Sequence, residues 1–195
     1  MTEPGIRFGG RMGLSGGAHL VVCGILAFIW GSSHPHPTGL MMFTSLWLTA
    51  FLCILVMFRT LFVMRIMGDR GRWLLIVPAM GALTYIVADV QIMMSGNQPA
   101  AVPMLRNAAL LTAIGMLMCG IATVMAGRWQ GWRRFTPLLV GLYPLLVMFP
   151  FATLYGGEPG GMIVGIWGVP WLLLGYALLS LAPAKASAGS VPVRA

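Results

Sequence analysis

The residues of this chain best suited to chemistry are one acid and one guanidinium inside its apolar stretches. Asp89 lies in the stretch from Trp73 to Met94, and Arg106 lies in the stretch from Ala101 to Ala126. A charged side chain inside a membrane helix costs about 2.5–3.5 kcal/mol on insertion scales, so each needs a partner or a purpose. Asp89 could transfer a proton or bind a cation, with Arg106 setting the pKa of Asp89 or binding the anionic part of a ligand.

Asp89 and Arg106 are expected at the same depth. Each lies about five residues from the end of its stretch, which is ~7–8 Å at the helical rise of 1.5 Å per residue. On consecutive antiparallel helices they can form a structural ion pair, in which each neutralises the desolvation of the other. The alternative is a functional site. A cavity that holds Asp89 beside aromatic rings would favour the functional site over the structural ion pair.

Other polar side chains share this end of the apolar stretches, namely Asn107, which is a candidate ligand-binding residue, and the pair His34 and His36. Imidazoles together with a carboxylate are suitable ligands for zinc or copper, so the two histidines are candidates for a metal site with Asp89 or Glu158 as a third ligand. A solvated turn is the plainer interpretation, because no spacing specifies the remaining ligands. We assign no cofactor.

The last apolar stretch carries Trp167, Trp171 and Tyr176, with a proline between the two tryptophans. A proline removes a backbone donor and kinks a helix, and the freed carbonyls of a broken membrane helix can line a cavity. The three aromatic faces would suit a flat apolar or cationic ligand. Gly161 and Gly165 in the same stretch have the spacing that lets membrane helices approach closely, and ordinary tight packing also explains them.

Six apolar stretches must position these residues. Hydrophobic residues make up 58% of the chain and charged residues only 8%, against about 25% charged in globular domains. Most stretches approach the ~20 residues that cross ~30 Å of hydrocarbon. We therefore predict an all-α integral membrane bundle of six transmembrane helices, at residues 18–30, 40–57, 73–94, 101–126, 136–155 and 161–182. Together they form one membrane domain over residues 18–182, between an N-terminal segment 1–17 and a disordered tail 183–195.

The basic residues predict how the helices are oriented. The chain has twelve Lys and Arg residues, and all except Arg106 fall in the N-terminal segment, the second and fourth connections or the tail. Because cytoplasmic loops retain Lys and Arg, this alternation places both termini in the cytoplasm of a multi-pass protein of the inner (plasma) membrane. The net charge of +8 is not read as nucleic-acid binding, since lipid headgroups are the nearer counterions.

The first apolar stretch also allows a second interpretation. A basic leader, an apolar run of about a dozen residues and the small residues Gly31, Ser32 and Ser33 are typical of a secretory signal and its cleavage site. Cleavage would leave five spans, with the N-terminus on the outer side of the membrane and the C-terminus still on the inner side.

The last third of the chain carries two distinctive segments, GWRRFTPLLVGLY at residues 131–143 and GVPWLLLGYAL at residues 168–178. In these segments the chain resembles a group of uncharacterised multi-span membrane proteins from high-GC bacteria. The resemblance implies a multi-span membrane fold. It implies no activity, because the shared residues are mostly interface and packing residues.

The sequence has no recognisable catalytic set, which favours a small transporter-like module or a subunit of a membrane assembly. Its expected partners are the lipid bilayer, other membrane subunits or a small apolar ligand, and not nucleic acid. The alternative is an intramembrane enzyme for an apolar, isoprenoid-like substrate, with Asp89 as general acid and aromatic rings that stabilise a developing cation. A third hypothesis is a metal or redox accessory protein that uses His34 and His36.

Overall fold

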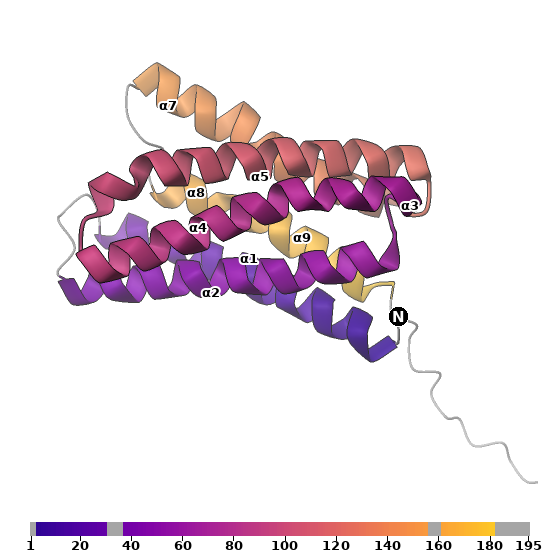
Figure 1. The fold of residues 1–195 in the computed structure, drawn as a ribbon, viewed down its shortest axis with the longest axis horizontal. Helices are drawn as coiled ribbons and strands as arrows, with labels where there is room; N and C mark the ends of the chain where they lie inside the picture. Colours follow the sequence, from indigo (N-terminus) through magenta and orange to yellow (C-terminus); the bar gives the residue numbers. More distant parts are fainter. Residues whose placement is uncertain (1–2, 31–36, 156–160, 182–195) are drawn as a thin grey trace, which may run out of the picture.

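The described part of the chain is entirely helical, which confirms the predicted fold class (Figure 1). The structure is a computed structural model, and it describes residues 3–30, 37–155 and 161–181. Within these ranges six helical segments are long and apolar enough to cross a membrane. The prediction of six long apolar helices is therefore confirmed, and we call these helical segments spans.

The first four spans are regular helices. They are α1 (Glu3–Trp30), α2 (Pro37–Met64), α4 (Ile76–Ser95) and α5 (Gln98–Ala126), with the short α3 (Gly68–Gly71) and η1 (Arg72–Leu75) leading into α4. The fifth span is interrupted and consists of η2 (Gly131–Phe135), α6 (Thr136–Tyr143), the π-helix η3 (Pro144–Met148) and α7 (Phe149–Tyr155). The sixth span consists of α8 (Gly161–Ile166) and α9 (Gly168–Leu179).

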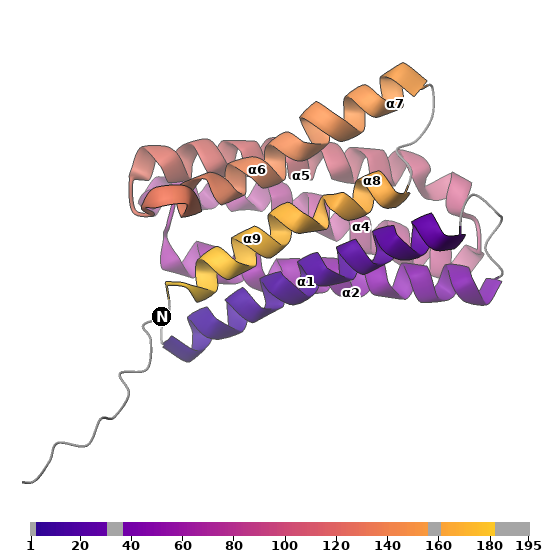
Figure 2. The ribbon, with the colours of Figure 1, turned by 180° about the vertical axis from the view of Figure 1, so that it is seen from behind.

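Neighbouring spans along the chain are also neighbours in space. In turn, α1 packs against α2, α2 against α4, α4 against α5, and α5 against α6. The ring closes because α9 packs against both α6 and α1, as the two opposite views show (Figures 1 and 2). Inside it lies a core whose largest fully buried side chains are Trp167, Trp171 and Phe51.

The first helix starts at Glu3, well before the start predicted at Ala18. Glycine is a poor helix former, and the glycines of this region disguised the helix in the sequence. Here they serve packing instead: a Cβ atom on Gly17 would lie 2.8 Å from the carbonyl oxygen of Gly168, and one on Gly24 would lie 2.6 Å from the Cα of Gly165. The sixth span therefore approaches α1 backbone to backbone, as small residues allow in membrane helices.

The interruptions of the fifth and sixth spans stabilise each other through two hydrogen bonds. Pro144 has no N–H, so the carbonyl of Val140 loses the donor that a regular helix would supply. The indole N–H of Trp167 replaces it at 2.9 Å. In return, the Tyr143 hydroxyl donates to the carbonyl oxygen of Ile163, at 2.7 Å, beside the break between α8 and α9. Each interruption thus receives a donor from the other span.

Beyond the π-helix, α7 diverges from the rest of the bundle. Figure 2 shows it leaning away from α5 and α8 toward its free end. Pro150 lies inside α7 and deletes a further backbone donor, so this half of the span is not held by a continuous helical ladder. The divergence separates the fifth span from its neighbours at one end of the bundle.

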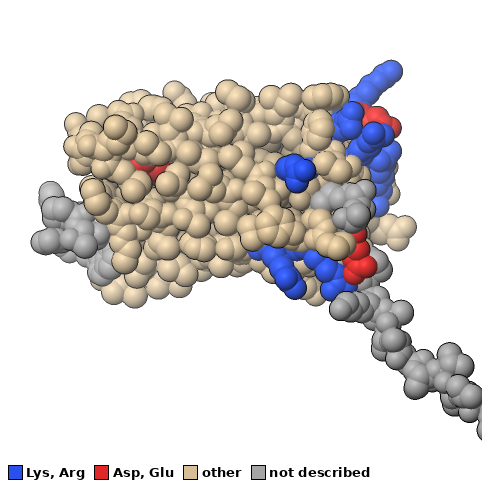
Figure 3. Space-filling view, turned by 60° about the horizontal axis from the view of Figure 1, so that its bottom comes forward, with Lys and Arg blue, Asp and Glu red and all other residues tan. Residues whose placement is uncertain are grey.

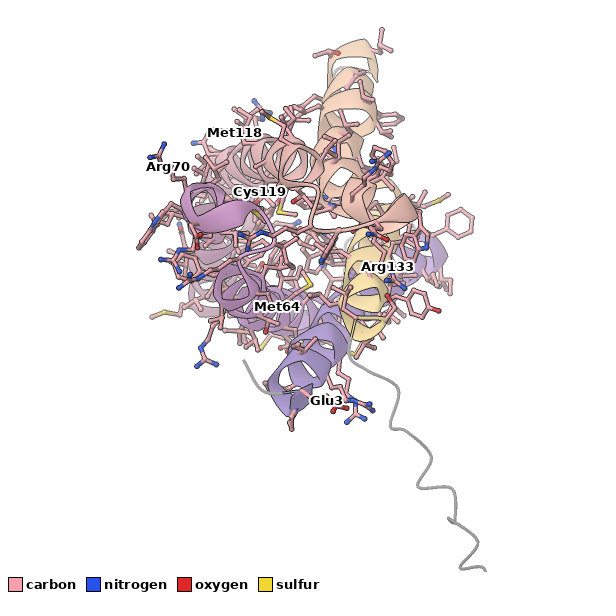
Figure 4. The ribbon with its side chains drawn as sticks, turned by 90° about the vertical axis from the view of Figure 1, so that its right-hand side faces the viewer. Glu3, Met64, Arg70, Met118, Cys119 and Arg133 are labelled. Carbon is pink, nitrogen blue, oxygen red and sulfur yellow. The ribbon has the colours of Figure 1, made fainter. Side chains whose placement is uncertain are left out.

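Charged side chains gather at the opposite end, which we call the basic end (Figure 3). Viewed end-on, Glu3, Arg70 and Arg133 lie around its rim (Figure 4). Two of its connections touch, because Arg128 donates to the carbonyl oxygen of Arg65 at 2.8 Å. The two internal connections that carry basic residues in the sequence therefore meet at a single end. We call the other end of the bundle the far end.

Candidate ligand cavity beside Asp89

A cavity of about 240 Å³ lies in the far half of the bundle, between α2, α4, α5, α8 and the divergent η3–α7 segment. Its lining follows helical spacing, so that each helix contributes one face. From α4 these residues are Tyr85, Asp89 and Ile92, which succeed one another by about one turn. The volume is below the roughly 300–1,000 Å³ of pockets for drug-sized ligands and corresponds to a small molecule.

Asp89 is the buried acidic group of this cavity. Asp89 is only 4% exposed, and its Oδ2 atom is buried without a hydrogen-bond partner. None of the ion pairs found among the described residues includes Asp89. Buried polar atoms almost always have partners, so this oxygen requires an explanation that packing does not supply.

Arg106 lines the same cavity from α5, but the structural ion pair expected between it and Asp89 is not among the ion pairs of the described residues. Arg106 is exposed while it lines the cavity, which places it at the open side. The two residues share one cavity, as the functional alternative requires. Asn107, the next residue, is exposed and does not belong to the lining, because adjacent helical residues point about 100° apart.

An aromatic wall lines the same cavity as Asp89, and it was not predicted from the sequence. Trp47 lies with its ring centroid 6.0 Å from that of Phe43 and 6.3 Å from that of Tyr85. All three side chains line the cavity. The indole nitrogen of Trp47 is buried without a hydrogen-bond partner. A signal for this wall existed in the sequence, since Tyr85 precedes Asp89 by four residues and therefore lies on the same helix face.

The three aromatic residues predicted to form a ligand site lie elsewhere. Trp167 and Trp171 are fully buried core residues whose ring centroids lie 5.7 Å apart. Tyr176 is 55% exposed and stacks on Trp132 at 6.0 Å. None of the three lines the cavity. Trp167 nevertheless lies close beneath it, because its ring centroid is 6.3 Å from that of Tyr85.

No group of three His, Cys, Asp or Glu side chains that could hold a metal ion occurs within residues 3–30, 37–155 and 161–181. The candidate metal ligands His34 and His36 lie outside these ranges, as does Glu158. The metal hypothesis therefore stays a prediction.

Comparison with family models, with curated proteins and with solved structures yields no match to this chain. The resemblance to multi-span proteins of high-GC bacteria therefore also stays a prediction. What the chain does must be inferred from the cavity itself.

Proposed function

We propose that this protein is a small transporter-like module of the bacterial inner membrane, alone or as a subunit of a larger assembly, and that it binds a small ligand beside Asp89. The observation that carries this proposal is the partnerless Oδ2 atom of Asp89 inside a cavity. A buried carboxylate costs several kcal/mol unless it is paired, so a position that served packing alone would favour an apolar residue. A ligand with a hydrogen-bond donor would supply the missing partner.

The interrupted fifth span supports movement at this site. Met148, Phe149 and Ala152 line the cavity, and they belong to the π-helix and to α7. Single π-turns inside helices are frequent at functional sites, and transporters often change access by moving part of a broken helix. A swing of α7 would widen or narrow the cavity without disturbing the ring formed by the other spans.

The charge distribution supports an orientation with both termini in the cytoplasm, because basic connections stay on that side. The cavity then lies in the periplasmic half of the bundle. The close contacts of Gly17 and Gly24 with the sixth span support retention of the first span, since cleavage would remove the partner of that face.

The second candidate function is an intramembrane enzyme in which Asp89 is the general acid. The specific observation in its favour is that Asp89 shares the cavity with Trp47 and Tyr85. Aromatic faces stabilise a cation that develops when an apolar substrate is protonated. The two candidate functions use the same residues but require different access.

A cysteine placed in the cavity distinguishes them. Thr44 lines the cavity from α2, and in Thr44→Cys we expect a charged thiol reagent to react from the periplasmic face and, more slowly, from the cytoplasmic face of inverted vesicles. The matched control is Leu52→Cys on the outward face of α2, which is 48% exposed in the bundle and should face lipid. The unmodified chain gives the background of its own three cysteines.

The outcomes separate the hypotheses. Reaction from both faces supports a transporter, and Pro144→Ala, which restores a backbone donor at the π-helix, should then abolish reaction from the cytoplasmic face. Reaction from the periplasmic face alone would contradict the transporter hypothesis and leave the intramembrane enzyme as the remaining candidate. No reaction from either face would overturn the ligand site altogether.

A further inference from the structure

The cavity has one buried acceptor that lacks a donor. Asp89 Oδ2 is partnerless, and when the carboxyl group is ionised it only accepts hydrogen bonds. A ligand that meets the ionised form must therefore present an N–H or O–H group at this point. Among donors, a protonated amine favours this form, because it compensates the buried negative charge.

The same cavity has one buried donor that lacks an acceptor. The indole N–H of Trp47, a residue 8% exposed, has no partner, and an indole can only donate. Arg106 adds a guanidinium to the lining, with five N–H donors that can serve several acceptors at once. To these donors the ligand must present an acceptor, and a positively charged neighbour favours an anionic one.

These opposite requirements lie within one small space. The volume of about 240 Å³ equals roughly eight waters at ~30 Å³ each. Phe43 and Tyr85 add aromatic faces, which attract an ammonium group. A plain cation would satisfy Asp89 but approach Arg106 with like charge, and a plain anion would have the reverse problem. A ligand with both charges satisfies both requirements.

We infer that the cavity binds a zwitterion whose primary ammonium group meets Asp89 and whose anionic group meets Trp47 and Arg106. This inference rests on the proposed ligand-binding function and names its ligand class. A free amino acid and the headgroup of phosphatidylethanolamine share this chemistry. A quaternary ammonium does not, because it has no N–H to donate to Asp89.

Binding to the purified full-length chain tests the inference. The probes are free L-leucine, measured by titration calorimetry, and phosphatidylethanolamine, counted by native mass spectrometry, with phosphatidylcholine as the quaternary counterpart. We expect phosphatidylethanolamine or L-leucine to bind, and the choline lipid to bind at least tenfold more weakly than the ethanolamine lipid. Binding of leucine alone identifies a free solute, and binding of the ethanolamine lipid alone identifies a headgroup; both support the zwitterion.

Two pairs of variants locate the binding. Trp47→Phe removes the indole donor from the cavity, whereas Trp171→Phe removes an equally partnerless indole outside it. Asp89→Asn removes the charge from the cavity, whereas Asp69→Asn removes an exposed carboxylate at the basic end. We expect at least a tenfold loss of affinity for Trp47→Phe and Asp89→Asn and less than a twofold change for both controls.

Three results would overturn the zwitterion: equal binding of the two lipids, loss of binding with Asp89→Asn but not with Trp47→Phe, or no binding of either probe. The comparison of the two lipids uses the unmodified chain, so it holds even where a variant fails to fold. If Thr44→Cys still reacts with the thiol reagent while no zwitterion binds, the ligand class is wrong and the ligand-binding cavity stands.

Discussion

Trp167 and Trp171 are both fully buried in the sixth span, yet only one of them has a partner for its indole N–H. Trp167→Phe should therefore lower the free energy of unfolding by about 1 kcal/mol more than Trp171→Phe, the usual scale of a hydrogen bond between membrane helices. The measurement is equilibrium unfolding in mixed micelles of mild and denaturing detergent. Equal losses in the two variants would show that the bond to Val140 contributes nothing.

At the residue scale, the sequence could locate Asp89 and Arg106 in one region but not their relation. Counting residues from the helix ends predicts how far each side chain lies from the end of the bundle. The two residues lie at a similar depth, which brings both into one cavity. Whether two side chains touch depends on how each helix is rotated about its axis, which depth does not set. Trp47 was missed for the same reason, since an aromatic residue among many carries no sign of the face it occupies.

At the scale of elements, the contact between α1 and the sixth span depends on glycines, whose lack of a side chain lets the two backbones approach. Gly165→Leu would place a branched side chain against the backbone of Gly24, and overpacking of this kind costs about 1–3 kcal/mol or more. Val22→Leu, at an outward position of α1, should change stability by less than about 0.5 kcal/mol. Detergent unfolding of both variants checks this, and an unaffected Gly165→Leu protein would contradict the observed contact.

The spans themselves were predictable because long apolar stretches carry a strong signal. Their interruptions were partly predictable, since Pro144 and Pro170 both delete a donor. Which groups would supply hydrogen bonds at these interruptions was not, because Trp167 and Tyr143 act across helices whose pairing the sequence does not specify. The extended start of α1 was hidden because glycine weakens the helical signal wherever it serves packing.

For the whole molecule, the proposed orientation makes a direct prediction. Ser95→Cys, at the far end of α4, should react with a membrane-impermeant thiol reagent added to intact spheroplasts, because it lies at the periplasmic side. Gln130→Cys, between α5 and η2 at the basic end, should react only after the membrane is opened. The reverse pattern would contradict the orientation and would place the cavity on the cytoplasmic side.

Hydropathy and charge predicted the six spans of the bundle and favour one orientation, but not that the ring closes. That the last span returns to the first is a property of matching glycine faces on segments far apart in sequence. Hydropathy treats these glycines as neutral, so it cannot reveal that the two segments complement each other.

The pairing of the first and last helices also has a consequence for biosynthesis. Roughly 140 residues separate Gly24 from Gly165. At a synthesis rate of roughly 5–20 residues per second, the glycine face of α1 is therefore made about 7–28 s before the segment that packs against it. During that interval the backbone at the glycines of α1 is exposed to lipid or to an insertion factor. A chain that ended before the final helix would therefore keep this glycine face of α1 without its packing partner.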